Sequence, residues 1–241
     1  MLVDIDEHNV VTLLFPAASS PLIDAEFCSS FDRACRAIDS NQNIRAVVIG
    51  RAAPSRHFCA GVHRTFLKQL SQKKSQEDVM SVLRQLSGSL LRLRNLQVPL
   101  IACVKGTLAG GGLAIALACD LIVADDTINI KFVNMQLGMG CLMDMSQRLV
   151  DRIGRHRTFA YMTQSTSVRG RNTLDVGLVD VLCQTKNVVE EGKAIARLYG
   201  RHPARGVKYW LEQHRSEHTS LTTADRYDRD DHSLAGIIAA L

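Results

Sequence analysis

Short apolar runs alternate with longer segments of helical periodicity along most of the chain. Aliphatic and β-branched runs predict buried strands, and apolar residues spaced three and four apart predict amphipathic helices. The expected strands lie at 9–15, 44–50, 98–104, 120–125 and 128–132. The expected helices lie at 22–39, with Asp24 as a possible cap, at 75–96 and from about 155 onward. This alternation predicts an α/β fold with parallel strands covered by helices.

The chain length and a break near the C-terminus bear on domain organisation. A chain of 241 residues suits one main domain with an appendage. Gly200 and Pro203 interrupt the helical pattern. We therefore expect a core over 1–198 and a C-terminal helical region over 199–241 that serves in oligomerisation. Packing of this region on its own core fits the pattern equally well.

Composition narrows the function classes. The net charge is +5, and the basic residues are dispersed with few aromatic residues among them, unlike a nucleic-acid-binding surface. A mild positive excess suits an anionic ligand or an acidic protein partner. No apolar run is long enough to span a membrane, and no export signal is visible. Seven cysteines without paired spacing predict reduced thiols in a cytoplasm, and no zinc-ligand spacing predicts a metal.

Two loops of small residues follow predicted strands. They are "FCAGV" at 58–62 and "AGGGL" at 109–113, and the second opens a helix. Small residues let a ligand approach the main chain, and two N–H groups that face one space form an oxyanion hole. The helix dipole would add to this effect. The alternative is that the glycines only allow tight backbone packing.

Four motifs in order carry a resemblance that extends over essentially the whole chain. "HFCAGV", "VKGTLAGGGLAIALACDLIVAD", "QRLVDRIG" and "VGLVD" resemble the crotonase, or enoyl-CoA hydratase/isomerase, superfamily. The resemblance implies a crotonase-like spiral of ββα units, a C-terminal helical region and a trimer or hexamer. It also implies a substrate acyl thioester carried on CoA or an acyl carrier protein, an enolate-like intermediate and no further cofactor.

The resemblance also implies which residues surround the acyl group. The oxyanion donors would be the N–H groups of Val62 and Gly111. Ala60, Gly61 and Gly110 would shape the substrate-binding loops around these donors.

The sequence departs from the family's hydratases where their two glutamates lie. Those positions hold Ala114 and Asn134, whose side chains do not titrate near neutral pH. The family's usual "PGAGG" loop is replaced by "CLMDM" at 141–145. Hydration by two carboxylates is therefore not expected. An oxyanion hole without a strong base still suits decarboxylation, and the chain is similar to enzymes of polyketide β-branching that dehydrate or decarboxylate carrier-bound thioesters.

Several side chains are candidates for proton transfer or substrate binding, each with a structural alternative. His63 could donate a proton or bind a carboxylate, or lie at the surface. Lys68 and Phe66 lie where the related decarboxylases have a lysine and a tyrosine-like residue, although Lys68 is out of register and could be simply solvated. Asp144 could be a catalytic carboxylate or a helix cap. Asn134 either contacts the acyl group or fills the former glutamate's space.

Other candidates favour structural roles. Cys141 has no neighbour that would activate a thiolate. The histidines of the C-terminal region, which are His214, His218 and His232, favour surface positions. The main hypotheses are an acyl-thioester lyase and a catalytically degenerate crotonase-fold scaffold that assembles with an active homologue. Another crotonase-type reaction, such as thioester hydrolysis or C–C bond cleavage, stays open.

Overall fold

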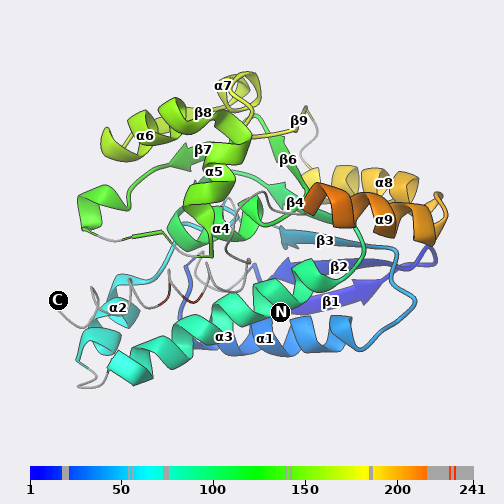
Figure 1. The fold of residues 1–241 in the computed structure, drawn as a ribbon, viewed down its shortest axis with the longest axis horizontal. Coiled ribbons are helices and arrows are strands. Elements are labelled where there is room, and N and C mark those ends of the chain that lie inside the picture. Colours follow the sequence, from blue (N-terminus) through cyan, green and yellow to red (C-terminus); the bar gives the residue numbers. More distant parts are fainter. Residues whose placement is uncertain are drawn as a thin grey trace.

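A six-stranded sheet forms the centre of the computed structural model (Figure 1). Its strand order is β1-β2-β3-β4-β6-β9, and every neighbouring pair is parallel except β1–β2. A second, three-stranded sheet has the order β5-β7-β8. The strands are β1 (Leu2–Ile5), β2 (Val10–Phe15), β3 (Ala46–Arg51), β4 (Leu100–Val104), β5 (Thr107–Ala109), β6 (Leu121–Asp125), β7 (Asn129–Lys131), β8 (Ser167–Arg169) and β9 (Val181–Cys183).

Helices connect and cover the strands. They are α1 (Ala25–Asp39), α2 (Arg64–Ser71), α3 (Gln76–Asn95), α4 (Gly110–Leu117), a 3-10 turn at Met135–Leu137, α5 (Met145–Ile153), α6 (Arg155–Thr163), α7 (Arg171–Asp175), α8 (Val188–Gly200) and α9 (Ala204–Arg215). The structure describes residues 1–17, 22–53, 55, 57–72, 76–138, 140–141, 143–184, 187–215, 228 and 231.

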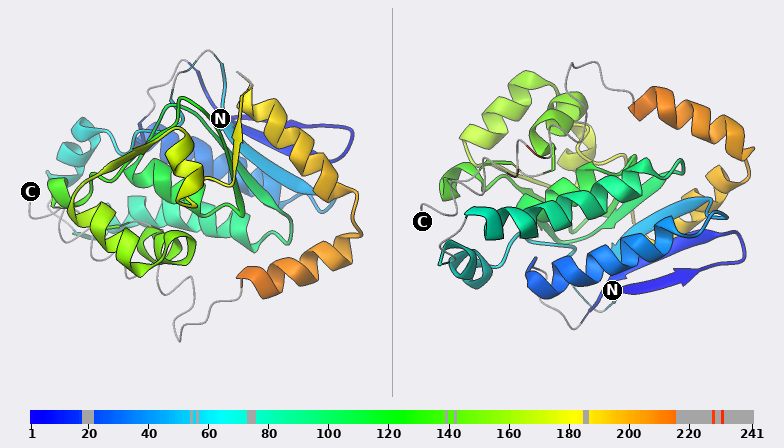
Figure 2. Two further views of the ribbon diagram at one scale, coloured as in Figure 1. Left: turned by 90° about the horizontal axis from the view of Figure 1, so that it is seen from above. Right: turned by 60° about the horizontal axis from the view of Figure 1, so that its bottom comes forward.

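The central strands β3 and β4 of the large sheet are buried on both faces, which explains their continuous apolar residues, whereas the edge strand β1 is exposed. Alternate side chains of each strand point to opposite faces. One face packs in the main core with α1 and α3, and the other packs against α8 through residues such as Val48 and Cys103. Figure 2 shows α8 and α9 at the periphery of the molecule, diverging from the turn that joins them.

The expected α/β fold is confirmed, and each predicted strand matches an observed one within about two residues. Asp24 caps α1, as predicted, because its carboxylate accepts the Phe27 N–H at 2.8 Å. Pattern analysis missed β1, β5, β8 and β9. Three of these have only three residues each, which leaves little room for a periodicity to appear, although β7, of the same length, was predicted.

The C-terminal region is described only in part. The expected boundary at 198–199 falls within α8, which runs to Gly200. Beyond α9, Asp228 and Asp231 contact α3 through Arg84 and Ser87 respectively. His218 and His232 lie outside the described residues, whereas His214 is exposed and stacks on Trp210 at a centroid distance of 4.7 Å.

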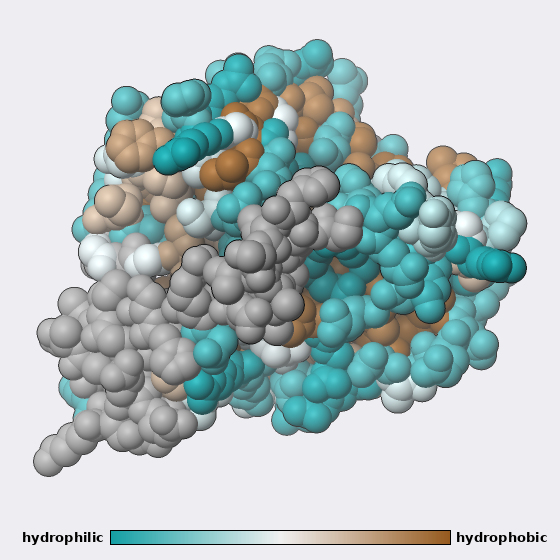
Figure 3. Space-filling view, viewed as in Figure 1, coloured by the Kyte–Doolittle hydropathy of each residue, from teal (hydrophilic) through white to brown (hydrophobic). Residues whose placement is uncertain are grey.

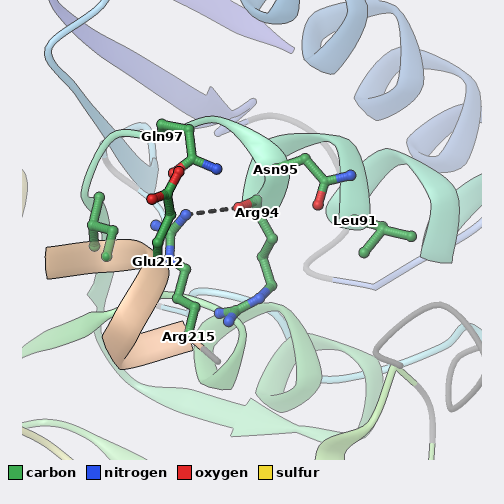
Figure 4. Close-up of a pocket in the computed structure, with 7 residues that line it drawn as sticks. Leu91, Arg94, Asn95, Gln97, Glu212 and Arg215 are labelled. Atoms are coloured by element: carbon green, nitrogen blue, oxygen red, sulfur yellow. Dashed lines mark hydrogen bonds between the residues drawn. The ribbon is translucent and has the colours of Figure 1, made fainter. Parts of the chain in front are cut away.

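One arginine fastens α9 to the main core. The Arg215 guanidinium donates to the carbonyls of Arg94, Leu96 and Val98 at 2.7–2.8 Å, and it pairs with the Asp120 carboxylate. A cavity of about 250 Å³ lies beside this contact, between the end of α3 and α9 (Figure 4). These carbonyls belong to the end of α3 and to the turn that leads to β4, so this contact joins α9 to that turn.

Candidate active site

The two loops of small residues lie against each other. Cys59 forms a parallel bridge with Leu108, and the Ala109 N–H donates to the Cys59 carbonyl at 3.2 Å. A methyl group placed on Gly110 would lie 3.7 Å from the Cα of Gly61. The two loops, about 50 residues apart in the sequence, therefore meet backbone to backbone at the start of α4.

Different constraints require glycine at three positions of these loops. Gly61 and Gly110 adopt φ values of +103° and +48°, which L-residues with side chains rarely adopt. Gly112 has no such dihedral, but a Cβ there would lie 2.3 Å from the Cys59 carbonyl oxygen. Tight packing therefore accounts for Gly112, and backbone conformation accounts for Gly61 and Gly110.

The two predicted oxyanion donors differ in how their N–H groups are left available. Val62 bridges Ile23 in parallel, and the flanking bonds are Ile23 N–H to the Gly61 carbonyl and His63 N–H to the Ile23 carbonyl. Within the described part of the chain, the Val62 N–H makes no backbone hydrogen bond. Gly111 lies in the first turn of α4, where N–H groups have no acceptor within the helix. Two amides in adjoining loops are thus available to an acceptor.

The first loop leads into α2, which carries Phe66 and Lys68; His63 and Ala60 precede the helix. His63 is half-buried, and its Nδ1 accepts the Thr65 N–H at 3.1 Å, so its neutral form carries the proton on Nε2. Phe66 is buried, whereas Lys68 is exposed and makes an interaction of its own. Ala60 is half-buried between Cys59 and Gly61. His63 therefore caps α2 through Nδ1, and in the neutral ring Nε2 is the nitrogen that can donate a hydrogen bond.

The positions of the two family glutamates are both buried and neutral. Ala114 is fully buried in α4. Asn134 is 7% exposed, and its Nδ2 donates to the Gly140 carbonyl at 2.8 Å. Asn134 therefore holds the loop before α5, a contact that the sequence analysis did not predict. Neither side chain can exchange a proton in a catalytic cycle.

Asp144 lies at the N-terminus of α5, in the altered loop. It has a φ of +60° and 2% exposure, and its side chain makes no capping hydrogen bond to the helix. Its Oδ2 lies 3.8 Å from Nη2 of Arg148, one turn along α5. A carboxylate and a guanidinium thus lie close together in the interior. The alternative role of Asp144 as a side-chain cap of α5 is not observed.

Every cysteine thiol whose pKa departs from its ordinary value has a raised pKa, so none of these thiols is activated. All seven are free, and six are buried. Burial raises the pKa of Cys59, in the first loop, to about 11, although the Gly61 N–H and Arg51 oppose this shift. Burial likewise raises the pKa of Cys119 to about 12. These thiols stay protonated at neutral pH, so the region around the loops offers polar backbone rather than a nucleophile.

Two described cavities lie away from the loops. The larger, of about 530 Å³, runs between α9 and strands β4 and β6 and is lined mainly by apolar residues.

The described residues contain no cluster of three metal-ligating side chains. No helix in the described part of the chain is long and apolar enough to cross a membrane. The adjoining loops, with the available N–H groups of Val62 and Gly111, are the candidate active site.

The family follows from a comparison with known proteins. The model of the enoyl-CoA hydratase/isomerase family matches residues 10–235. The chain belongs to that family. A Thermus thermophilus protein named "Putative enoyl-CoA hydratase" is 28% identical over 204 residues, covering 84% of this chain and 78% of the relative. The crotonase-superfamily resemblance of the loop motifs is thereby confirmed.

Solved structures of the enoyl-CoA hydratase/isomerase family share the fold. "A putative enoyl-CoA hydratase/isomerase from Acinetobacter baumannii" superposes with a TM-score of 0.86 at 22% identity, covering 99% of this chain and 93% of that one. An enoyl-CoA hydratase from Bacillus halodurans superposes with a TM-score of 0.85 at 18% identity, covering 98% and 94%. At these identities the likeness establishes the crotonase-like architecture.

Sequence reasoning overlooked Arg148 as a functional candidate. This residue stands in the "QRLVDRIG" motif that supported the family resemblance, four residues after Asp144. The i, i+4 spacing of an acid and a base on a helix was the signal that could have drawn attention to it.

Proposed function

We propose that the protein is an acyl-thioester lyase that decarboxylates or dehydrates a substrate carried on CoA or an acyl carrier protein. The supporting observation is the pair of available amides, Val62 and Gly111, in two adjoining loops of a chain that lacks both hydratase glutamates. In this proposal the amides hold the thioester oxygen and stabilise the negative charge that develops on it.

Decarboxylation needs little more than this stabilisation. The C–C bond to the departing carboxylate breaks, carbon dioxide leaves, and the electron pair passes through the α-carbon to the thioester oxygen as an enolate. The enolate then takes back one proton. In dehydration, by contrast, a base must remove a proton from the α-carbon while an acid protonates the departing hydroxyl.

Three side chains are proposed to supply or hold the proton. His63 keeps Nε2 for this task, since its Nδ1 accepts the Thr65 N–H. Asp144 offers a buried carboxylate at the N-terminus of α5. Lys68 is proposed only as a distant acid or a contact for the carrier, because its side chain is exposed. Phe66 and Asn134 are proposed to shape the acyl pocket.

Incubation with two thioesters tests the lyase. We expect the protein to convert a 3-methylglutaconyl thioester with loss of carbon dioxide, or a 3-hydroxy-3-methylglutaryl thioester with loss of water, as followed by mass spectrometry. Gly111→Pro removes one amide N–H and should lower the turnover by about 10²–10³-fold. Unchanged masses with both substrates would contradict the proposal.

A scaffold function is the second candidate, favoured by the structural use of Asn134. Its amide holds the Gly140 carbonyl, as expected of a residue that has replaced a catalytic group. In that case the protein would co-purify with an active homologue and show no turnover alone. We propose self-association into a trimer or hexamer in either case, as in the resemblance noted above.

A further inference from the structure

Arg148 is a buried cation whose hydrogen-bonding capacity is incompletely used. Its side chain is 10% exposed, and in the described structure Nε and Nη2 have no hydrogen-bond partner. The Asp144 carboxylate, 3.8 Å away, is beyond hydrogen-bonding distance. Because an arginine stays charged in proteins, two donors of a permanent cation are left unpaired in the interior.

Arg215 provides a comparison at the same exposure. Its side chain is also 10% exposed, yet its guanidinium donates to three backbone carbonyls and to both oxygens of Asp120. Buried charges are normally satisfied in this way, because an unpaired one is costly. The surroundings of Arg148 therefore lack an acceptor that those of Arg215 contain.

The position of Arg148 relates this missing acceptor to the candidate active site. Arg148 lies on α5 one turn after the altered loop, and α5 packs against α4, whose first turn carries Gly111 (Figure 1). Nε and Nη2 form one edge of the planar guanidinium. That edge matches the two oxygens of a carboxylate, which it binds with two parallel hydrogen bonds.

We propose that Arg148 binds the distal carboxylate of a dicarboxylic acyl thioester. This inference rests on the proposed lyase function and names its substrate class: acyl groups that carry a second carboxylate remote from the thioester. The negative charge of Asp144 weakens this binding without abolishing it, because it lies near Nη2 but does not occupy the edge. Arg148 would thus select the substrate and orient it against the oxyanion donors.

Binding of two CoA esters with equal carbon number tests the inference. Glutaryl-CoA ends in a carboxylate where valeryl-CoA ends in a methyl group. By calorimetry, we expect the wild-type protein to bind glutaryl-CoA at least about tenfold more tightly than valeryl-CoA. Arg148→Gln should abolish this preference and leave valeryl-CoA binding unchanged. Asp144→Asn should increase the preference, because it removes a like charge.

Arg152→Gln is the matched control, since it removes an arginine from the same helix that pairs with Asp180. This variant should keep the wild-type preference. Equal binding of the two esters by the wild type would overturn the role of Arg148 while leaving thioester binding intact. A preference for glutaryl-CoA without any lyase turnover would overturn only the lyase. Binding of neither ester, and of neither acyl group when it is carried on an acyl carrier protein, would overturn both.

Discussion

Backbone geometry at single residues brings the candidate active-site loops together. Gly61 and Gly110 supply left-handed backbone conformations, and Gly112 supplies the absence of a side chain where α4 packs on Cys59. The glycine-rich pattern predicted both a ligand-binding loop and tight packing as alternatives. Both descriptions apply, but to different glycines, and sequence could not separate them because each constraint depends on a residue about fifty positions away.

Gly112→Ala tests the packing constraint. A Cβ at this position would lie 2.3 Å from a backbone carbonyl oxygen, which cannot rotate away as a side chain would. We expect the free energy of unfolding to fall by about 2–4 kcal/mol in urea denaturation.

Gly88→Ala is the control for the glycine-to-alanine exchange. Gly88 is exposed in the middle of α3 with no atom within 4 Å of the added methyl group. The exchange should raise stability by about 0.5–1 kcal/mol, because alanine favours helix. Equal effects at the two positions would contradict the close packing of Gly112.

At the scale of elements, hydrophobic periodicity predicts the long helices and the buried strands. The α1 and α3 helices and strands β2, β3, β4 and β6 have enough residues to show a pattern. The short strands and the attachment of α9 arise from contacts between distant segments, which no local pattern contains. The bonds of Arg215 to the turn after α3 are the clearest case, since they join residues 117–121 positions apart.

Arg215→Met tests how strongly this contact fixes α9. The change leaves Asp120 and three carbonyls without their donor in a largely buried site. We expect a loss of about 3–5 kcal/mol in the free energy of unfolding. Faster amide hydrogen exchange over 94–100 should accompany it, because the Leu100 N–H also donates to Asp120.

Arg205→Met serves as the comparison within α9, since Arg205 is exposed. Its stability should stay within about 0.5 kcal/mol of wild type. A small effect at Arg215 with unchanged exchange would show that α9 is held mainly by apolar contacts such as that of Leu211.

At the scale of the whole molecule, the apolar surface is unevenly distributed. The face in Figure 3 is mostly hydrophilic, with separate apolar patches. The exposed large apolar residues form two groups, one on β1 (Leu2, Val3 and Ile5) and one on α8 and α9 (Leu198, Tyr199, Tyr209 and Trp210). Trp210 also lines the apolar cavity of about 530 Å³. The amphipathic pattern of 199–241 suited either association with another subunit or packing on its own core, and which of its residues are exposed depends on how α9 folds back on the sheet.

Trp210 is the single tryptophan of the chain and can report directly on the proposed self-association. Its side chain is 54% exposed in one copy, so burial between copies should shift its fluorescence to shorter wavelength. We expect this shift to be reversed on dilution, in step with the fall in mass measured by light scattering. Trp210→Ser should lower the mass at a concentration where Leu2→Ser, which changes an exposed apolar residue of β1, does not. A monomer at all concentrations would contradict self-association, whereas an assembly with unshifted tryptophan emission would place its interface elsewhere.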